Sequence, residues 1–251
     1  MSAREYLQKA VQLLETIERT QMEAIQRAAR AGAASIAAGR AVHLFGSGHS
    51  VIPVLDLFPR YGAYVGLHPI MDPRLMWFSI TGPGGARELL WLERTEGYVQ
   101  QVLLSHHLDP RDTMLIYSHG GLNAAPVEMA LAAKEKGLTV VGVTCAANRT
   151  INQPTHSSGK ALHDIADIVI DNCCPPEDAL IPVEGRPEKV GASSTLAAVA
   201  ISMALLAEMT GELVRLGKTP ERIFVSPNVK GVSPANNQQV FQDYMAFEKR
   251  L

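Results

Sequence analysis

The stretch Val42-His43-Leu44-Phe45-Gly46-Ser47-Gly48-His49-Ser50 joins a short, mainly apolar run to a loop of small and hydroxyl-bearing residues. A brief apolar run that ends abruptly in such a loop is typical of a buried strand followed by a turn. The pattern returns at Met114-Leu115-Ile116-Tyr117, which leads into Ser118-His119-Gly120-Gly121. Three further runs of strand length lie at residues 63–67, 139–144 and 168–170.

Helical patterns flank these runs at residues 3–30, 87–105, 124–136, 194–216 and 236–250. Short runs that are apolar on both faces and alternate with helices predict a parallel sheet covered on both sides. We therefore expect an α/β protein, a three-layer sandwich with a long N-terminal helix. Asn123 is expected to cap the helix at 124–136, and Pro59 to end the helix after the first loop.

The N-terminal helix carries an apolar stripe at spacings of three and four residues. Its members are Leu7, Ala10, Val11, Leu14, Ile17, Met22 and Ile25. A stripe of this length must be buried, either against the body of the protein or against a second subunit.

Composition excludes several classes of protein. The chain of 251 residues has a formal net charge of −2, which gives no field for attracting nucleic acid or an anionic membrane. Cys145, Cys173 and Cys174 are odd in number and form no CxxC pair, so neither a disulfide framework nor a structural zinc site is expected. The N-terminal segment is an amphipathic charged helix and not a secretion signal. No apolar run of membrane-spanning length is free of charge, so we expect a cytoplasmic protein.

Three loops rich in glycine and hydroxyl residues precede expected helices. They are Ser47-Gly48-His49-Ser50, Ser118-His119-Gly120-Gly121 with Asn123, and Ser193-Ser194-Thr195. Ligands of open parallel sheets bind beyond the carboxyl ends of the strands, where the first two loops lie. A helix N-terminus offers unpaired N–H groups, small residues let an anion approach, and hydroxyls add donors. Helix capping explains any one loop better, but three together favour phosphate binding. The expected phosphate ligands are Ser47, Ser118, Ser194 and Thr195.

Other phosphate-binding folds fit the sequence less well. There is no GxxxxGK[ST] motif, which excludes a P-loop. The spacing Gly46-x-Gly48 lacks the third glycine of a dinucleotide-binding loop. A nucleotide-binding α/β protein is therefore the least favoured alternative.

The stretch from His43 to Ser50 resembles the first strand and loop of SIS (sugar isomerase) domain proteins, above all a set of uncharacterised bacterial proteins with a single SIS domain. The resemblance continues, in order, through residues 92–98, 123–131, 156–160 and 189–195. It implies a flavodoxin-like sheet of five parallel strands that binds a phosphorylated sugar at the strand ends, in a homodimer or homotetramer. Residues 1–251 would form one SIS domain. Its parts would be an N-terminal helix at 1–38 that contacts another subunit, an α/β core at 40–217 and a C-terminal extension at 218–251.

The sequence departs from the family pattern at two places. Relatives tend to carry Ser-x-Ser-Gly in the second phosphate loop, where this chain has Gly120 in place of the second serine. Relatives also tend to carry a Glu-Glu pair in the helix after the first loop, where this chain has Leu55-Asp56. Both differences favour a protein that binds a phosphosugar without converting it.

Aldose–ketose isomerisation needs a base that moves a proton between C1 and C2, a task that histidines and carboxylates perform. The candidates are His49, His119, Glu93 and Glu96. For His49 a packing or capping role is equally open. Glu93 and Glu96 lie three apart on one expected helix, and a solvated charged face is the favoured alternative. Lys189 could supply charge to a phosphate, or lie on the surface.

The residues expected to contact substrate are drawn from the three loops and their flanks. They are Gly46, Ser47, Gly48, Ser50, Ser118, Gly120, Gly121, Asn123, Lys189, Ser193, Ser194 and Thr195. No metal is expected, because the adjacent His106 and His107 would point apart on a helix. The expected function is a sugar-phosphate isomerase without a cofactor. The alternatives are a non-catalytic phosphosugar sensor and an amino-sugar-phosphate lyase or etherase.

Overall fold

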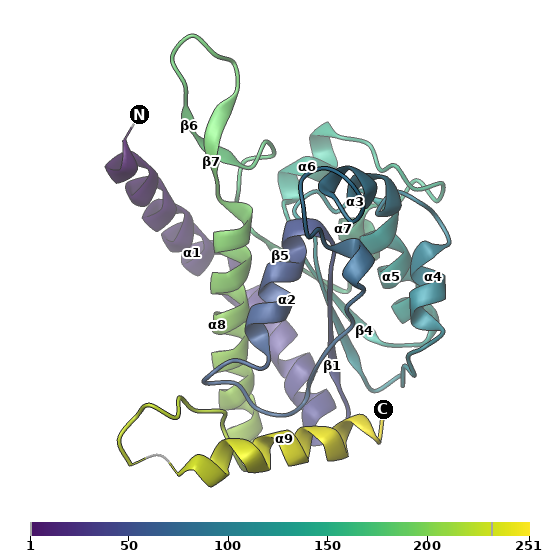
Figure 1. Ribbon diagram of the computed structural model, residues 1–251, viewed down its shortest axis with the longest axis vertical. Coiled ribbons are helices and arrows are strands. Elements are labelled where there is room, and N and C mark those ends of the chain that lie inside the picture. The colour runs from purple at the N-terminus through teal and green to yellow at the C-terminus, as the bar shows by residue number, and fades with distance from the viewer. Residues whose placement is uncertain (1, 232) are drawn as a thin grey trace.

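The computed structural model of the protein describes residues 2–231 and 233–251. Its centre is a sheet of five strands in the order β2-β1-β3-β4-β5, and every neighbouring pair is parallel (Figure 1). The strands are β1 (Val42–Gly46), β2 (Leu67–Pro69), β3 (Thr113–Tyr117), β4 (Thr139–Thr144) and β5 (Ile168–Asp171). The expected α/β fold with a five-stranded parallel sheet is confirmed.

Two hydrophobic cores lie on the two faces of this sheet. One contains Leu44, Leu115 and Val141, and it packs against α1 (Ala3–Ala37), α2 (Val51–Leu57) and α8 (Ser194–Arg215). The other contains Phe45 and Ile116, and it packs against the remaining helices of the sandwich. These are α3 (Ala86–Leu92), α4 (Tyr98–Leu103), α5 (Ala124–Glu135) and α7 (Leu162–Ile165). Neighbouring residues of one strand thus enter opposite cores, as the period of a strand requires.

Two expected elements differ from the structure. The strand expected at 63–67 is a buried turn followed by β2, because Gly66 has a φ of 129°, far from the negative φ of extended strands. The aromatic side chain of Tyr64 is fully buried there, although its backbone lies in a loop and not in a strand. The helix expected at 87–105 is divided into α3 and α4, because Gly97 between them has a φ of 83°. The helix after the first loop ends at Leu57, as Pro59 predicts.

The long first helix is confirmed, but its apolar stripe is only partly covered. Ala10 and Ile17 are buried in the core. By contrast, Leu7 is 63% exposed and Val11 is 55% exposed, and the start of α1 stands away from the body in Figure 1. The second half of α1 packs along α8. By length and composition alone α8 could cross a membrane, but helices in the cores of water-soluble proteins pass the same test.

A hairpin arm that the sequence did not predict stands beside the start of α1 (Figure 1). It consists of the antiparallel strands β6 (Ala179–Pro182) and β7 (Lys189–Ala192). Tyr6 donates its hydroxyl hydrogen to the carbonyl of Ala192 at 2.7 Å, and Lys9 donates to the carbonyl of Leu180 at 2.9 Å. The arm therefore rests on α1. At the other end of the molecule, α9 (Pro234–Glu248) lies across the foot of the sandwich.

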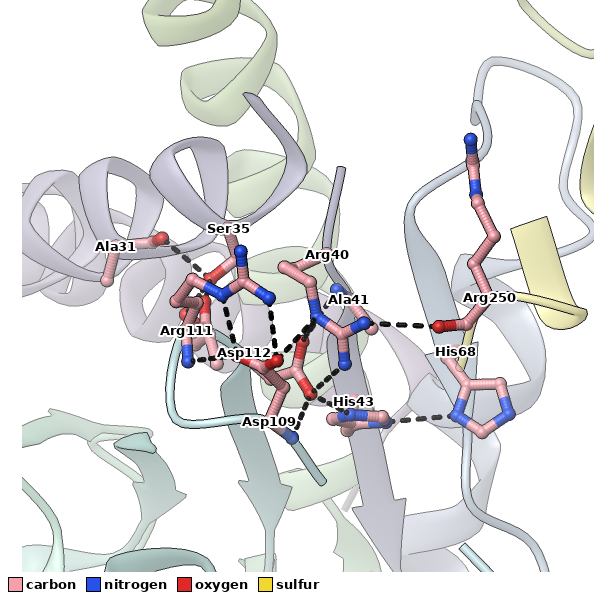
Figure 2. A network of polar contacts seen from close by, with 11 residues as sticks. Ala31, Ser35, Arg40, Ala41, His43, His68, Asp109, Arg111, Asp112 and Arg250 are labelled. Atoms are coloured by element: carbon pink, nitrogen blue, oxygen red, sulfur yellow. Dashed lines mark hydrogen bonds and ion pairs between the residues drawn. The ribbon is translucent and has the colours of Figure 1, made fainter. Parts of the chain in front are cut away.

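A buried carboxylate, Asp112, holds the amino ends of β1 and β3 together (Figure 2). Arg40 donates to its two oxygens at 3.0 and 3.1 Å, and His43 Nε2 lies 3.1 Å from it. The backbone N–H groups of Ala41 and Asp109 also donate to it, at 3.0 and 2.8 Å. Burial alone would raise the pKa of Asp112, but these hydrogen bonds together lower it well below its usual value.

The network continues through histidines to the edge of the sheet. Nδ1 of His43 lies 3.0 Å from Nδ1 of His68, and the ring of His68 packs edge-on against His106. Burial, followed by the charges of His43 and His106, lowers the pKa of His68 to about 4. His106 and His107 follow α4 in a loop and not on a helix; His106 faces His68, whereas His107 is exposed.

Acidification should destabilise the protein through His68. Its folded pKa lies below its unfolded value, so its stabilisation is complete above about pH 6.5 and is lost as the pH falls toward 4. Between about pH 7 and pH 4.5 the free energy of unfolding should fall by about 2 kcal/mol on this account. Urea unfolding at both pH values should show a smaller fall for His68→Gln. An equal fall in both proteins would contradict the assignment.

Candidate functional site

A pocket lies beyond the carboxyl ends of the central strands, where the three expected loops meet. Its lining is His49, Ser50, Pro53, Tyr117, Ser118, His119, Val143, Asn172, Ser194, Thr195 and Ala198. Parallel pairing sets Gly46 of β1 opposite Tyr117 of β3, so the loops that follow these strands begin side by side. The N-terminus of α8 completes the pocket with Ser194 and Thr195.

The first loop turns sharply because Gly46 has no side chain. A Cβ on Gly46 would lie 2.1 Å from the carbonyl oxygen of Ser50, which is too close for any side chain. The loop continues as a short 3-10 turn, η1 (Gly48–Ser50), and leads directly into α2. His49 packs edge-on against Trp77, with ring centroids 4.4 Å apart, and lines the pocket next to Ser50.

The second loop is a tight turn between β3 and α5. The N–H of Gly121 donates to Ser118 Oγ at 3.1 Å, so Ser118 keeps its own hydroxyl hydrogen for another partner. Gly121 has a φ of 66°, and a Cβ there would lie 2.7 Å from Thr144 Oγ1, which makes glycine necessary. Beside it, Gly120 leaves open space, since no described atom lies within 4 Å of a Cβ added to it.

Glu93 ties the first loop to the second. Its carboxylate accepts the hydroxyl hydrogen of Ser47 at 2.9 Å and a side-chain amide hydrogen of Asn123 at 2.8 Å. It also lies close to Gly48, where an added Cβ would be 4.0 Å from its Oε2. Glu93 is only 8% exposed, and this burial raises its pKa despite the opposing hydrogen bond from Ser47. A carboxylate with a raised pKa beside two ligand loops is suited to accept and return a proton.

The structure corrects two expectations about these residues. Asn123 stands at the N-cap of α5, but its side chain donates to Glu93 and makes no capping hydrogen bond. Glu93 and Glu96 do not share a solvated face, because α3 ends at Leu92 and the chain then turns. Glu93 points inward, whereas Glu96 is exposed and accepts hydrogen bonds from Ser157.

The third loop is capped by a carboxylate of the protein itself. The N–H of Ser193 donates to Asp178 Oδ1 at 3.0 Å, and the N–H of Ser194 donates to the same oxygen at 2.6 Å. Ser194 also donates its hydroxyl hydrogen to Asp178 Oδ2 at 2.8 Å. Thr195, the next residue of α8, lines the pocket.

His119 has a hydrogen-bond partner at each ring nitrogen. Nδ1 lies 3.1 Å from the side-chain amide nitrogen of Asn172, and Nε2 lies 3.1 Å from the carbonyl oxygen of Pro176. The amide nitrogen is a donor and the carbonyl oxygen an acceptor, so these partners favour the tautomer that accepts at Nδ1 and donates from Nε2. His119 thus orients Asn172 at the pocket wall, and its catalytic role stays a prediction.

Among the expected site residues that are absent from the pocket lining are Ser47, Glu93, Glu96 and Lys189. Ser47 and Glu93 lie beside the pocket, since Ser47 precedes the loop of His49 and Ser50 and is hydrogen-bonded to Glu93. Lys189 is on the hairpin arm and pairs with Glu177 at 2.5 Å. The pocket lining contains no Lys or Arg, so its donors to an anion would be neutral hydroxyl and N–H groups. Within residues 2–231 and 233–251, no group of three or more His, Cys, Asp or Glu side chains could hold a metal ion.

Sequence reasoning missed three residues at this site. Asn172 directly follows β5, so the rule that ligands bind beyond strand ends could have identified it. Trp77 and Asp178 lie in irregular segments with no periodic pattern, and only the folded chain brings them to His49 and to α8.

Comparisons with known proteins agree with this architecture. Residues 5–145 match the family model described as SIS domain. The UPF0309 protein of Caldanaerobacter subterraneus subsp. tengcongensis is 35% identical over 249 residues, which is 98% of this chain and 97% of that protein. The UPF0309 protein of Thermoanaerobacter pseudethanolicus is 32% identical over 251 residues, 98% of this chain and 99% of that protein. A solved phosphoheptose isomerase from Francisella tularensis shares the fold, with a TM-score of 0.53, 14% identity, and coverage of 83% of this chain and 98% of that one.

Replacing Glu93 with Gln should leave the protein at least as stable as wild type near pH 7. A raised folded pKa means that the neutral side chain is preferred and that stability is lost as the pH rises through that pKa. Gln stays neutral, so its advantage in melting temperature should grow with pH. Glu93→Ala instead leaves Ser47 and Asn123 without their acceptor. This should lower the free energy of unfolding by about 1–3 kcal/mol.

Glu96→Gln is the control, because Glu96 is exposed and hydrogen bonds from Ser157 lower its pKa. Thermal unfolding across the pH range should show no growing advantage for this variant. If Glu93→Gln had as low a melting temperature as Glu93→Ala, the negative charge of Glu93 would stabilise the fold. That result would contradict a raised pKa for Glu93.

Proposed function

Because the chain belongs to the SIS domain family, and within it to the UPF0309 proteins, we propose that it is a sugar-phosphate isomerase whose substrate occupies the pocket between the three loops. The observation that carries this proposal is Glu93. It is a buried carboxylate with a raised pKa, and hydrogen bonds from Ser47 and Asn123 position it between the first and second loops.

The proposed phosphate contacts are neutral. The hydroxyls of Ser50 and Thr195 have no side-chain partner within the described residues, and Ser118 accepts from Gly121 while its hydrogen stays free. The name of the solved isomerase with this fold refers to a phosphosugar, which agrees with such a ligand.

The proposed chemistry is a proton transfer along the sugar. The Glu93 carboxylate takes the proton from C2 of the open-chain aldose, the electron pair of that C–H bond forms the C1=C2 double bond, and the carbonyl π pair moves onto the C1 oxygen to give an enediolate. A proton then moves from the C2 oxygen to the C1 oxygen, and Glu93 returns its proton to C1 as the C2 carbonyl forms, which leaves a ketose. His49, which lines the pocket, is the group proposed to carry the proton between the oxygens.

The first experiment is a thermal-shift screen of sugar phosphates against the matching free sugars, followed by proton NMR in D₂O. The best sugar phosphate should raise the melting temperature. With wild-type protein this sugar phosphate should also take up solvent deuterium at C1 or C2.

Glu93→Gln should still bind the sugar phosphate, but its rate of deuterium exchange should be lower by about 100-fold or more. Ser118→Ala should weaken binding by about 10-fold, whereas Ser105→Ala on the exposed surface should not.

Other outcomes separate the alternatives. Binding without exchange or product would identify a phosphosugar sensor, which the departures at Gly120 and Leu55-Asp56 favour. Loss of a substituent from an amino-sugar phosphate would identify a lyase or etherase. No melting shift with any sugar phosphate would contradict the proposal as a whole.

We also propose that a second copy of the chain covers the exposed start of α1. Leu7 and Val11 form an uncovered apolar face there, and Val190 of the adjacent arm is 52% exposed. Two-fold symmetry would bring the same face of both copies together, so one apolar strip can cover its counterpart.

Val11→Glu should convert the assembly to smaller species by placing a charge in that face. Size-exclusion chromatography with light scattering measures the change. Leu216→Glu is the matched control, since Leu216 is equally exposed at 53% but lies at the far end of α8. A monomeric wild-type protein, or equal effects of the two substitutions, would contradict the interface.

A further inference from the structure

Asp178 is an anion directly behind the proposed phosphate pocket, hydrogen-bonded to Ser194 of the pocket lining. Its carboxylate holds the N–H groups of Ser193 and Ser194 and the hydroxyl of Ser194, at 3.0, 2.6 and 2.8 Å. It lies directly before β6, and Ser193 lies directly after β7, so these contacts close the base of the hairpin arm. The backbone of Asp178 has a φ of 64°, which is uncommon for a residue with a side chain.

The contact sets the polarity of Ser194. A serine hydroxyl has one hydrogen and two lone pairs. Ser194 gives its hydrogen to Asp178, so only lone pairs of this hydroxyl remain for another partner. The dianion of a phosphate monoester carries no hydrogen on its phosphate oxygens, so it cannot donate to these lone pairs. A sugar hydroxyl carries a hydrogen and can.

The opposite polarity is found at the other hydroxyls of the pocket. Ser118 accepts from the N–H of Gly121, which directs its own hydrogen elsewhere. Within the described residues, Ser50 and Thr195 have no side-chain partner that takes their hydrogens. These three hydroxyls can therefore donate to phosphate oxygens, whereas Ser194 cannot.

The charge of Asp178 acts in the same direction. A helix N-terminus attracts anions through its partial positive charge and its unpaired N–H groups. At α8, Asp178 already occupies the N–H of Ser194 and offsets that charge. A second anion at the same place would meet a carboxylate of like sign.

We propose that Asp178 determines the specificity of the pocket, by making Ser194 an acceptor for a sugar hydroxyl and by confining the phosphate to the side of Ser118, Ser50 and Thr195. This inference rests on the proposed function. It changes one sequence-based expectation, since Ser194 contacts the sugar and not its phosphate.

The test compares Asp178→Asn with Glu177→Gln. Both remove one negative charge from neighbouring positions, but Glu177 pairs with Lys189 on the arm and does not line the pocket. Calorimetry should measure the Kd of two probes, inorganic phosphate and the best sugar phosphate of the screen.

The amide introduced by Asp178→Asn can donate to Ser194 Oγ, which frees the hydroxyl hydrogen of that serine. The variant should therefore bind inorganic phosphate about 10-fold more tightly than wild type does. The ratio of the two Kd values, which measures the preference for the sugar phosphate over inorganic phosphate, should become smaller. Glu177→Gln should change neither value.

A second variant covers the case in which Asp178→Asn does not fold. Ser194→Ala leaves the charge of Asp178 and its contacts with the N–H groups in place, and removes the hydroxyl that serves as acceptor. This variant should weaken the binding of the sugar phosphate by about 10-fold and leave the Kd of inorganic phosphate unchanged. Equal weakening of both probes would overturn the inference.

The remaining outcomes are distinguishable. A wild-type protein that binds no sugar phosphate overturns the proposed function, and this inference with it. A wild-type protein that binds the sugar phosphate, with Asp178→Asn indistinguishable from Glu177→Gln, overturns the inference alone.

Discussion

The register between β1 and β3 is the constraint on which the site depends, and Asp112 holds it at the amino end of the sheet. Its carboxylate joins the turn after α1, through Arg40, to the backbone of Ala41 and to His43 of β1. Two strands held in this register start and stop together. The loops after Gly46 and Tyr117 must then emerge side by side, although α2, β2, α3 and α4 separate them in sequence.

The buried carboxylates at the two ends of the sheet have pKa values shifted in opposite directions. At the amino end Asp112 has a full set of donors, including a guanidinium, and its pKa is lowered. At the carboxyl end Glu93 accepts from Ser47 and Asn123 and has the half-exposed guanidinium of Arg94 at 3.5 Å, but burial outweighs these contacts and raises its pKa. A lowered pKa marks an ion that stabilises the fold. A raised pKa marks a carboxylate ready to take up a proton, which is the property that acid–base chemistry requires.

Much of the fold could be predicted from sequence, because β3 and β4 are apolar on both faces and each ends in a turn. The strand predicted at 63–67 was wrong because a buried Tyr64 has the same apolar character in a loop as in a strand. The three loops could be singled out by their glycine and hydroxyl residues, and residues of all three line one pocket. The direction of Glu93 was not predictable, because it depends on where α3 ends. Asp178 was hidden for a similar reason, since it reaches α8 only through the hairpin arm.

Carboxylates divide the serines in and beside the pocket into two kinds. Ser47 and Ser194 both follow the rule that small hydroxyl residues begin helices, and both were equal candidates for phosphate in the sequence. In the structure each donates to a carboxylate, Ser47 to Glu93 and Ser194 to Asp178, whereas Ser118 accepts from a backbone N–H. Residue type alone thus identifies a hydroxyl, but its partner decides whether that hydroxyl donates or accepts. In a pocket without lysine or arginine, this division is what can tell the phosphate end of a ligand from its sugar end.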